Sequence, residues 1–183
     1  MELAPADEKL LKSLAVAMVD HPRGSFKAIA QAAGVSKATL NRFCGTRDKL
    51  IDLLMNYCSE VMERAIATAG LMSEPPLEAL HKLIEHHLIN RELLVFLIVQ
   101  WRPDPSEAEP DNRWQTYSDA LDAFFLKGQT EGVFRIDIAA PALSEIFVSI
   151  LFGLSDAERR GRVARSGMAA LIEMSFLRGA VKG

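Results

Sequence analysis

Residues 25–44 read SFKAIAQAAGVSKATLNRFC, and the expected architecture can be built outward from this segment. Ala30 is a small residue where two helix backbones could cross closely. Gly34, four residues later, can adopt the left-handed conformation of a tight turn. Apolar residues stand where the pair of helices would meet a preceding helix: Ile29, Ala33, Val35, Leu40 and Phe43. This spacing predicts a helix-turn-helix, with Ser36 as the N-cap of its second helix.

The second helix of this pair would leave one face free of large apolar residues. That face carries small, hydrogen-bonding and cationic side chains: Lys37, Ala38, Thr39, Asn41 and Arg42. Such a face fits the major groove of DNA, which is about 12 Å wide. The alternative is a helical hairpin inside an α-bundle with no DNA contact. The polar, cationic face favours DNA binding over that alternative.

The first helix and the segment AIAQAAGVSKATLNRFCGTRDKLIDLL, residues 28–54, resemble the N-terminal domain of the tetracycline-repressor (TetR) family of one-component regulators. The resemblance covers residues 8–55. A second segment, GQTEGVFR at 128–135, is similar to the turn before the dimerisation helices in many members. The resemblance implies a recognition helix over 36–43, and it implies that Ser25 and Lys27 touch phosphates.

Arg47 stands where members of the family commonly have a phosphate-binding lysine. The position also has a physical reason, since free N–H groups and the helix dipole at the start of a helix favour an anion. Three residues depart from the family pattern: Asn41 replaces a usual tyrosine, Cys44 a usual phenylalanine and Ala28 a usual acid. Asparagine can pair bidentately with adenine, so position 41 could shift from backbone positioning to base readout.

The rest of the chain is divided into helix-sized pieces by glycine, proline and acidic residues, and no stretch keeps a two-residue alternation. The fold class is therefore all-α. Helices are expected over 7–20, 25–33, 36–44, 47–69, from 73 onward, 90–101, 114–131, 140–154 and 162–178. A loop is expected over 102–112 and a turn over 132–137. We expect a three-helix DNA-binding domain at 1–52, a linking helix at 47–69 and a helical effector-binding and dimerisation domain at 53–183.

The charge distribution agrees with a DNA-binding head. The 183-residue chain has a net charge of −3, but residues 1–52 hold eight Lys and Arg against six Asp and Glu, a net of +2. The remainder holds 13 against 18, a net of −5. No apolar run approaches the roughly 20 residues that cross a bilayer, and no secretory signal is visible. Two cysteines match neither a disulfide framework nor a metal site, so we expect a cytoplasmic protein with no membrane contact.

A single small helix-turn-helix binds DNA weakly, so we expect a homodimer whose recognition helices lie about 34 Å apart on successive major grooves. The dimer interface is predicted on the apolar stripes of the last two helices: Leu143, Phe147, Ile150, Leu151, Leu154, Met168, Leu171, Ile172 and Ser175. The same stripes could instead form the core of one chain. The candidate effector pocket is drawn from two histidines and the aromatic residues near them: His86, His87, Trp101, Trp114, Tyr117 and Phe124. These residues could equally be plain core.

The two segments that resemble enzyme metal motifs are incomplete. The segment from His81 to His86 has one residue too many for the H-x-x-E-H zinc pattern, and Glu78 with His81 is half of a di-iron motif. We expect no catalytic residue, metal or cofactor. The sequence predicts a dimeric one-component repressor that binds a palindromic operator and is released by a lipophilic or aromatic effector. The rival prediction is a helical protein-interaction adaptor without DNA contact.

Overall fold

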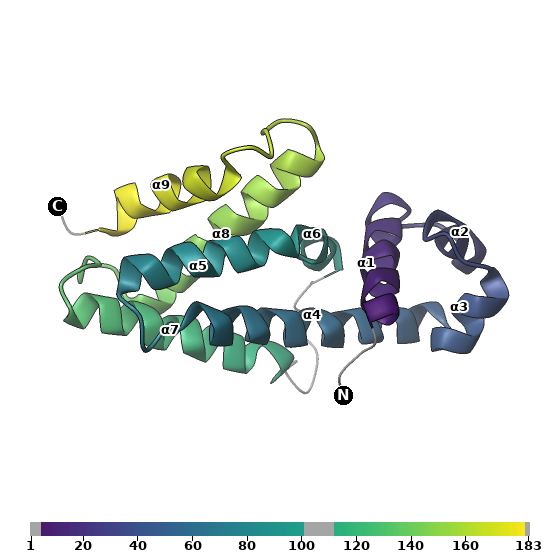
Figure 1. Cartoon of the computed structure of the whole chain (residues 1–183), viewed down its shortest axis with the longest axis horizontal. Helices are drawn as coiled ribbons and strands as arrows, with labels where there is room; N and C mark the ends of the chain where they lie inside the picture. The colour runs from purple at the N-terminus through teal and green to yellow at the C-terminus, as the bar shows by residue number, and fades with distance from the viewer. Residues whose placement is uncertain (1–4, 101–111, 182–183) are drawn as a thin grey trace. The chain divides into compact units, whose positions relative to one another are not determined.

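The computed structural model describes residues 5–100 and 112–181, and within them the chain is helical (Figure 1). The chain divides into two compact units, one of residues 1–58 with 92–107 and one of residues 59–91 with 108–183. The first unit therefore reaches beyond the expected boundary at 52 and also takes in a later helix. The described helices are α1 Pro5–Asp20, α2 Phe26–Ala32, α3 Lys37–Cys44, α4 Arg47–Ala69, α5 Pro76–Ile89, α6 Arg91–Gln100, the short 3-10 helix η1 Asn112–Trp114, α7 Gln115–Thr130, α8 Ala140–Arg159 and α9 Met168–Ala180.

Local sequence explains how α2 and α3 begin and how the turn between them is made. The Ser25 hydroxyl accepts the Ala28 N–H at 3.2 Å and caps α2. Gly34 has φ +75°, the left-handed conformation for which glycine is suited, and the Val35 N–H then donates to the Ala30 carbonyl at 2.9 Å. Ala30 is fully buried. The predicted helix-turn-helix is confirmed in the fold.

The first unit also contains the start of α4, which is set by a second left-handed glycine. Gly45 has φ +79°, and the Thr46 hydroxyl accepts the Lys49 N–H at 3.2 Å as an N-cap. The α4 helix then runs without a break from the first unit into the second. The core of the first unit is built from fully buried apolar side chains: Leu11, Leu14, Met18, Ile29, Leu40, Leu50, Leu54 and Phe96.

The second unit is organised around a cluster of buried phenylalanines on α7, α8, α9 and the α7–α8 connection. Its members are Phe124, Phe125, Phe134, Phe147 and Phe176, with neighbouring ring centroids 5.0 to 6.4 Å apart. In this unit α7 packs on α8, and α9 packs on both α8 and α5. Such tilted and edge-on ring pairs stabilise a core beyond the area that they bury.

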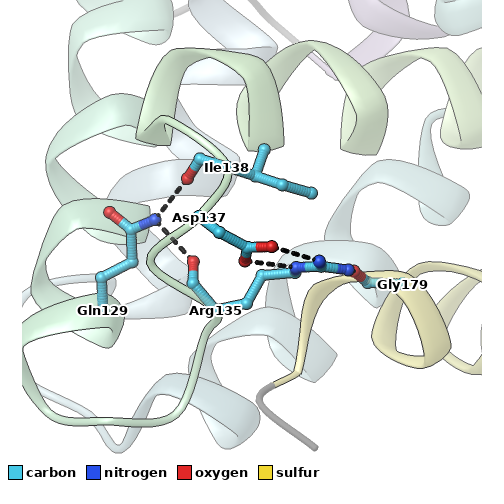
Figure 2. A network of polar contacts seen from close by, with 5 residues as sticks. All are labelled: Gln129, Arg135, Asp137, Ile138 and Gly179. Carbon is cyan, nitrogen blue, oxygen red and sulfur yellow. Dashed lines mark hydrogen bonds and ion pairs between the residues drawn. The ribbon is translucent and has the colours of Figure 1, made fainter.

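The α7–α8 connection is held in place by side chains rather than by a regular strand pair (Figure 2). The Gln129 side-chain amide donates to the carbonyls of Arg135 and Ile138, at 2.8 and 2.7 Å. Arg135 is paired with Asp137, and its guanidinium donates to the Gly179 carbonyl near the end of α9 at 3.1 Å. An isolated β-bridge joins Phe134 to Val181. The expected turn over 132–137 is confirmed and is anchored to α9.

Three expectations about helix ends were wrong. The eighth helix continues to Arg159 instead of ending near 154. The last helix begins at Met168 rather than at 162, because Gly167 has φ +78° and stands outside the helix. The helix expected over 90–101 begins at Arg91 instead, and the Asn90 side-chain amide donates to the His86 carbonyl at 3.2 Å and closes the end of α5.

Among the described helices, α8 has the length and composition that could span a bilayer. One of its sides is occupied by the phenylalanine cluster and the other carries partly exposed apolar residues. An apolar helix of a protein core meets the same criterion, so the composition of α8 is weak grounds for a membrane segment.

Candidate nucleic-acid interface

The recognition helix α3 is organised by its N-cap. The Ser36 hydroxyl accepts the Thr39 N–H at 3.0 Å and lies 2.9 Å from the Thr39 hydroxyl oxygen. Leu40 and Cys44 are buried, so they fix which side of α3 faces the core. One side of the helix is thereby committed to packing, and the opposite side is free to meet a partner.

The opposite side of α3 exposes the side chains that the sequence singled out. Lys37, Ala38, Asn41 and Arg42 are exposed, and Thr39 is half-buried beside them. The surface combines two cations, one amide and one small residue. These groups can donate hydrogen bonds to phosphate oxygens and to base edges. Their contacts with DNA remain a prediction.

The start of α2 carries a second pair of exposed polar side chains in the first unit. Ser25 and Lys27 are both exposed. The lone pairs of Ser25 Oγ receive the Ala28 N–H, while its own hydroxyl proton is left to donate outward. A hydroxyl donor and an ammonium two residues apart suit a phosphate oxygen.

Arg47 lies at the first residue of α4 and is half-buried. Its Nη1 donates to the Gly24 carbonyl at 2.7 Å, and its Nη2 donates to the Pro22 carbonyl at 2.7 Å. The guanidinium therefore binds the turn between α1 and α2, a role that the sequence did not reveal. The signal that could have suggested it is the His-Pro-Arg-Gly turn at 21–24, whose carbonyls have no helical partners.

Both cysteines are packed as apolar groups. Burial raises the pKa of the Cys44 thiol, and the Cys44 Sγ donates to the Leu40 carbonyl at 3.4 Å. Burial raises the pKa of Cys58 to about 12. A thiol that keeps its proton is a poor nucleophile and a poor metal ligand. The described residues contain no group of three or more His, Cys, Asp or Glu side chains placed to hold a metal.

Of the predicted effector residues, His87 and Tyr117 form a hydrogen-bonded pair in which His87 is fully buried and Tyr117 is half-buried. The His87 Nδ1 lies 2.6 Å from the Leu83 carbonyl oxygen, which can only accept, so Nδ1 carries the proton. The His87 Nε2 then accepts the Tyr117 hydroxyl at 2.8 Å. Desolvation lowers the pKa of His87 to about 4 and raises that of Tyr117. The ring of His87 is also edge-on to Phe147.

The other predicted effector residues are distributed differently. Phe124 is fully buried in the phenylalanine cluster, while His86 and Trp114 are half-buried. The Trp114 Nε1 is buried and has no hydrogen-bond partner among the described residues. Trp101 lies outside the described residues. The hydrogen bond brings His87 and Tyr117 together, and a pocket lined by the whole set stays a prediction.

An open pocket of about 440 Å³ lies elsewhere in the second unit, between the end of α5 and the start of α9. None of the predicted effector residues lines it. The lining residues are Glu85, Leu88, Ile89, Arg91, Arg165, Gly167, Met168 and Ala169. The carboxylate of Glu158 accepts from Arg165 at 2.7 Å and pairs with Arg91 at 3.5 Å, so both cations of the pocket have an acidic partner.

The residues predicted at a dimer interface fall into two groups. Five are buried inside their own chain: Leu143, Phe147, Leu151, Met168 and Ile172. The other four, Ile150, Leu154, Leu171 and Ser175, retain exposed surface. Two large apolar residues on the same helices, Ile146 and Met174, are 42% and 45% exposed. A partner chain could therefore reach the outer faces of α8 and α9 but not the five core residues.

Comparison with known proteins agrees with this geometry. The chain is 53% identical over 181 residues to the HTH-type transcriptional regulator NfxB of Pseudomonas aeruginosa, which covers 98% of this chain and 97% of NfxB. The structure of the TetR-like regulator LfrR from Mycobacterium smegmatis in complex with proflavine is similar, with a TM-score of 0.73, 22% identity and 97% of each chain covered.

The structure of AibR with isovaleryl coenzyme A and operator DNA has a TM-score of 0.69 and 18% identity, over 91% of this chain and 96% of AibR. At these identities the solved structures establish a shared fold. No family model matches the chain.

Proposed function

Because this chain belongs to the TetR family of helix-turn-helix transcriptional regulators, we propose that it is a homodimeric repressor that leaves a palindromic operator when a small molecule binds. Members of this family bind DNA and are not enzymes. The observation that carries the proposal is the exposed polar face of α3, opposite the buried Leu40 and Cys44. A protein that used α3 for packing would cover that face with apolar residues.

Two kinds of contact are assigned to this face. Lys37 and Arg42 neutralise phosphates, which gives affinity for any duplex. Asn41 reads a base edge, because its amide can donate to and accept from adenine at the same time. Ser25 and Lys27 bind the phosphate backbone of the DNA on one side of the major groove. The family's usual tyrosine is absent at position 41, so this chain reads a different operator from relatives that keep the tyrosine.

The test is fluorescence anisotropy with a duplex taken from upstream of the chain's own gene and with a random duplex. The affinity of the wild type should fall steeply as the salt concentration rises. In a plot of log affinity against log salt concentration, each neutralised phosphate should contribute about −0.9 to the slope. Lys37→Ala should weaken binding to both duplexes alike and should reduce the salt slope by the amount of about one phosphate contact. Asn41→Ala should cost about 1–3 kcal/mol on the operator and little on the random duplex. A chain that acts as a protein adaptor would bind neither duplex with this salt dependence.

The homodimer is proposed on the outer faces of α8 and α9. Ile146 and Met174 are large, apolar and exposed, and they flank Ile150, Leu154 and Leu171, which are half-buried. A two-fold axis would bring the same patch of two copies together. Ile146→Asp should shift the chain from dimer to monomer in sedimentation, because the buried charge would have no partner. Leu126→Asp, on the exposed face of α7, is the control and should leave the mass unchanged.

The effector is proposed to be lipophilic or aromatic, and to act through α4, which runs through both units. Support comes from the aromatic residues of the second unit and from the LfrR structure, which holds proflavine. Only a compound with different affinities for the DNA-bound and DNA-free states can release the operator. Proflavine is a suitable first probe, since its fluorescence reports binding directly. A compound that binds tightly but leaves operator affinity unchanged is not the inducer.

A further inference from the structure

We propose that Arg47 is a positioning residue for DNA binding, which holds the α1–α2 turn to the start of α4 and so sets where Ser25 and Lys27 meet the phosphate backbone. This proposal rests on the proposed interface and assigns Arg47 a role different from that of a simple phosphate ligand. The argument begins from the two hydrogen bonds of its guanidinium.

The guanidinium of Arg47 is matched to two main-chain acceptors. Nη1 and Nη2 lie 2.7 Å from the carbonyl oxygens of Gly24 and Pro22, respectively. The same turn is closed internally, because the Gly24 N–H donates to the His21 carbonyl at 2.8 Å. A planar fork with two fixed donors can bridge two acceptors at once, whereas an ammonium is a point charge on a flexible stem. The contact therefore requires arginine rather than any cation.

The bridged carbonyls stand directly before the phosphate-facing start of α2. Gly24 is followed by Ser25, the N-cap of α2, and Lys27 lies in the first turn of that helix. At the other end of the bridge, Arg47 follows the two-residue link after α3. Arg47 thus joins the entrance of α2 to the exit of α3, two points 23 residues apart in the chain. The bridge fixes the spacing between the recognition helix and the side chains at position 25 and position 27.

Three of the five guanidinium N–H groups are not used by these two bonds. Arg47 can still face a phosphate, but its geometry is set by the turn that it holds. A lysine at this position would keep the charge and lose the bridge. The substitution Arg47→Lys therefore separates the positioning role from the electrostatic one.

The experiment compares Arg47→Lys, Lys27→Ala and the double variant in anisotropy titrations with the upstream duplex and a random duplex, from 50 to 200 mM salt. Arg47→Lys should weaken binding by about tenfold although the charge is unchanged, the size expected for losing a charged hydrogen bond. Its log–log slope should fall by about 0.9, because the Lys27 contact is lost with it. Lys27→Ala should lower the DNA affinity of the wild type, but it should change the DNA affinity of the Arg47→Lys variant by less than twofold.

Two further variants serve as a control and as an independent test of the bridge. Lys49→Gln removes a charge from an exposed side chain in the same helical turn without touching the bridge, so it should leave the effect of Lys27→Ala intact. Gly24→Ala moves the acceptor and leaves Arg47 in place, since a Cβ there would lie 2.8 Å from the His21 Cβ and 3.1 Å from its carbonyl oxygen. Gly24→Ala should lower the DNA affinity as much as Arg47→Lys does, and the two substitutions together should lower it little further. This comparison tests the bridge even if Arg47→Lys lowers the melting temperature.

The positioning role is refuted if Arg47→Lys binds within twofold of the wild type, or if Lys27→Ala costs the same in both backgrounds. Failure of the proposed interface has a different signature. In that case the wild-type chain would bind neither duplex with a salt-dependent affinity, and all the variants would resemble it.

Discussion

Acidification should destabilise the second unit through His87. The folded ring is neutral because its pKa is lowered by burial to about 4, whereas the ordinary value of 6.5 applies once the chain unfolds. Above pH 6.5 neither state binds the proton, so the stability is at its full value. As the pH falls from 6.5 toward 4, the unfolded state takes up a proton that the folded state refuses. Stability is then lost, and the loss stops below about pH 4.

The magnitude follows from the size of the pKa difference. Each pKa unit corresponds to about 1.4 kcal/mol, so the loss at pH 5 should be about 2 kcal/mol and the complete loss about 3 kcal/mol. The assay is urea unfolding from pH 7.5 to 5, comparing the wild type with His87→Gln. Glutamine stays neutral and can still donate to the Leu83 carbonyl and accept from Tyr117. Taking the difference between the two proteins removes the carboxylates and the other histidines from the comparison.

The result that refutes this reasoning is an equal dependence of stability on pH in the two proteins. That outcome would mean that His87 titrates normally when folded, and hence that water or a ligand reaches the ring. Tyr117→Phe is a second check. It leaves the His87 Nε2 buried without a donor, so it should cost about 1–3 kcal/mol at pH 7.5.

Three other outcomes are expected. Gly128→Ala should destabilise the chain by about 1–3 kcal/mol in urea unfolding, because the new Cβ would lie 2.3 Å from the Phe134 Cδ2 inside a filled core; an unchanged midpoint would contradict this packing. Ser36→Ala should cost about 1 kcal/mol and weaken operator binding, since it removes the cap of α3; Ser166→Ala, on an exposed loop residue, is the matched control. The pKa of His81 is raised chiefly by its hydrogen bond to Glu173, so Glu173→Gln should lower it in an NMR titration, and an unshifted curve would disprove the contact.

Local signals in the sequence were sufficient for the DNA-binding head. Ser25, Ser36 and Thr46 act as N-caps, and Gly34 forms the turn, because capping and left-handed backbone depend on neighbouring residues alone. The exposure of the recognition face followed from helical periodicity, which places Leu40 inward and Asn41 outward.

Contacts between distant residues could not be predicted in the same way. The His-Pro-Arg-Gly turn at 21–24 marks acceptor carbonyls, but no local pattern indicates that Arg47, more than 20 residues further along the chain, is their donor. The stripes of α8 and α9 are apolar on more than one side, so periodicity could not divide core residues such as Phe147 from outer ones such as Ile146. That division depends on which neighbouring helix covers each side.

The anchoring of the α7–α8 connection bears on where the chain can be engineered. Connections between helices usually tolerate inserted residues, yet this one is tied by Gln129 and Arg135 at three carbonyls, so its length is fixed. A fluorescent label or a peptide tag placed there would detach the end of α9. The exposed stretch 160–166 is the better attachment point, since lengthening it leaves those three bonds intact.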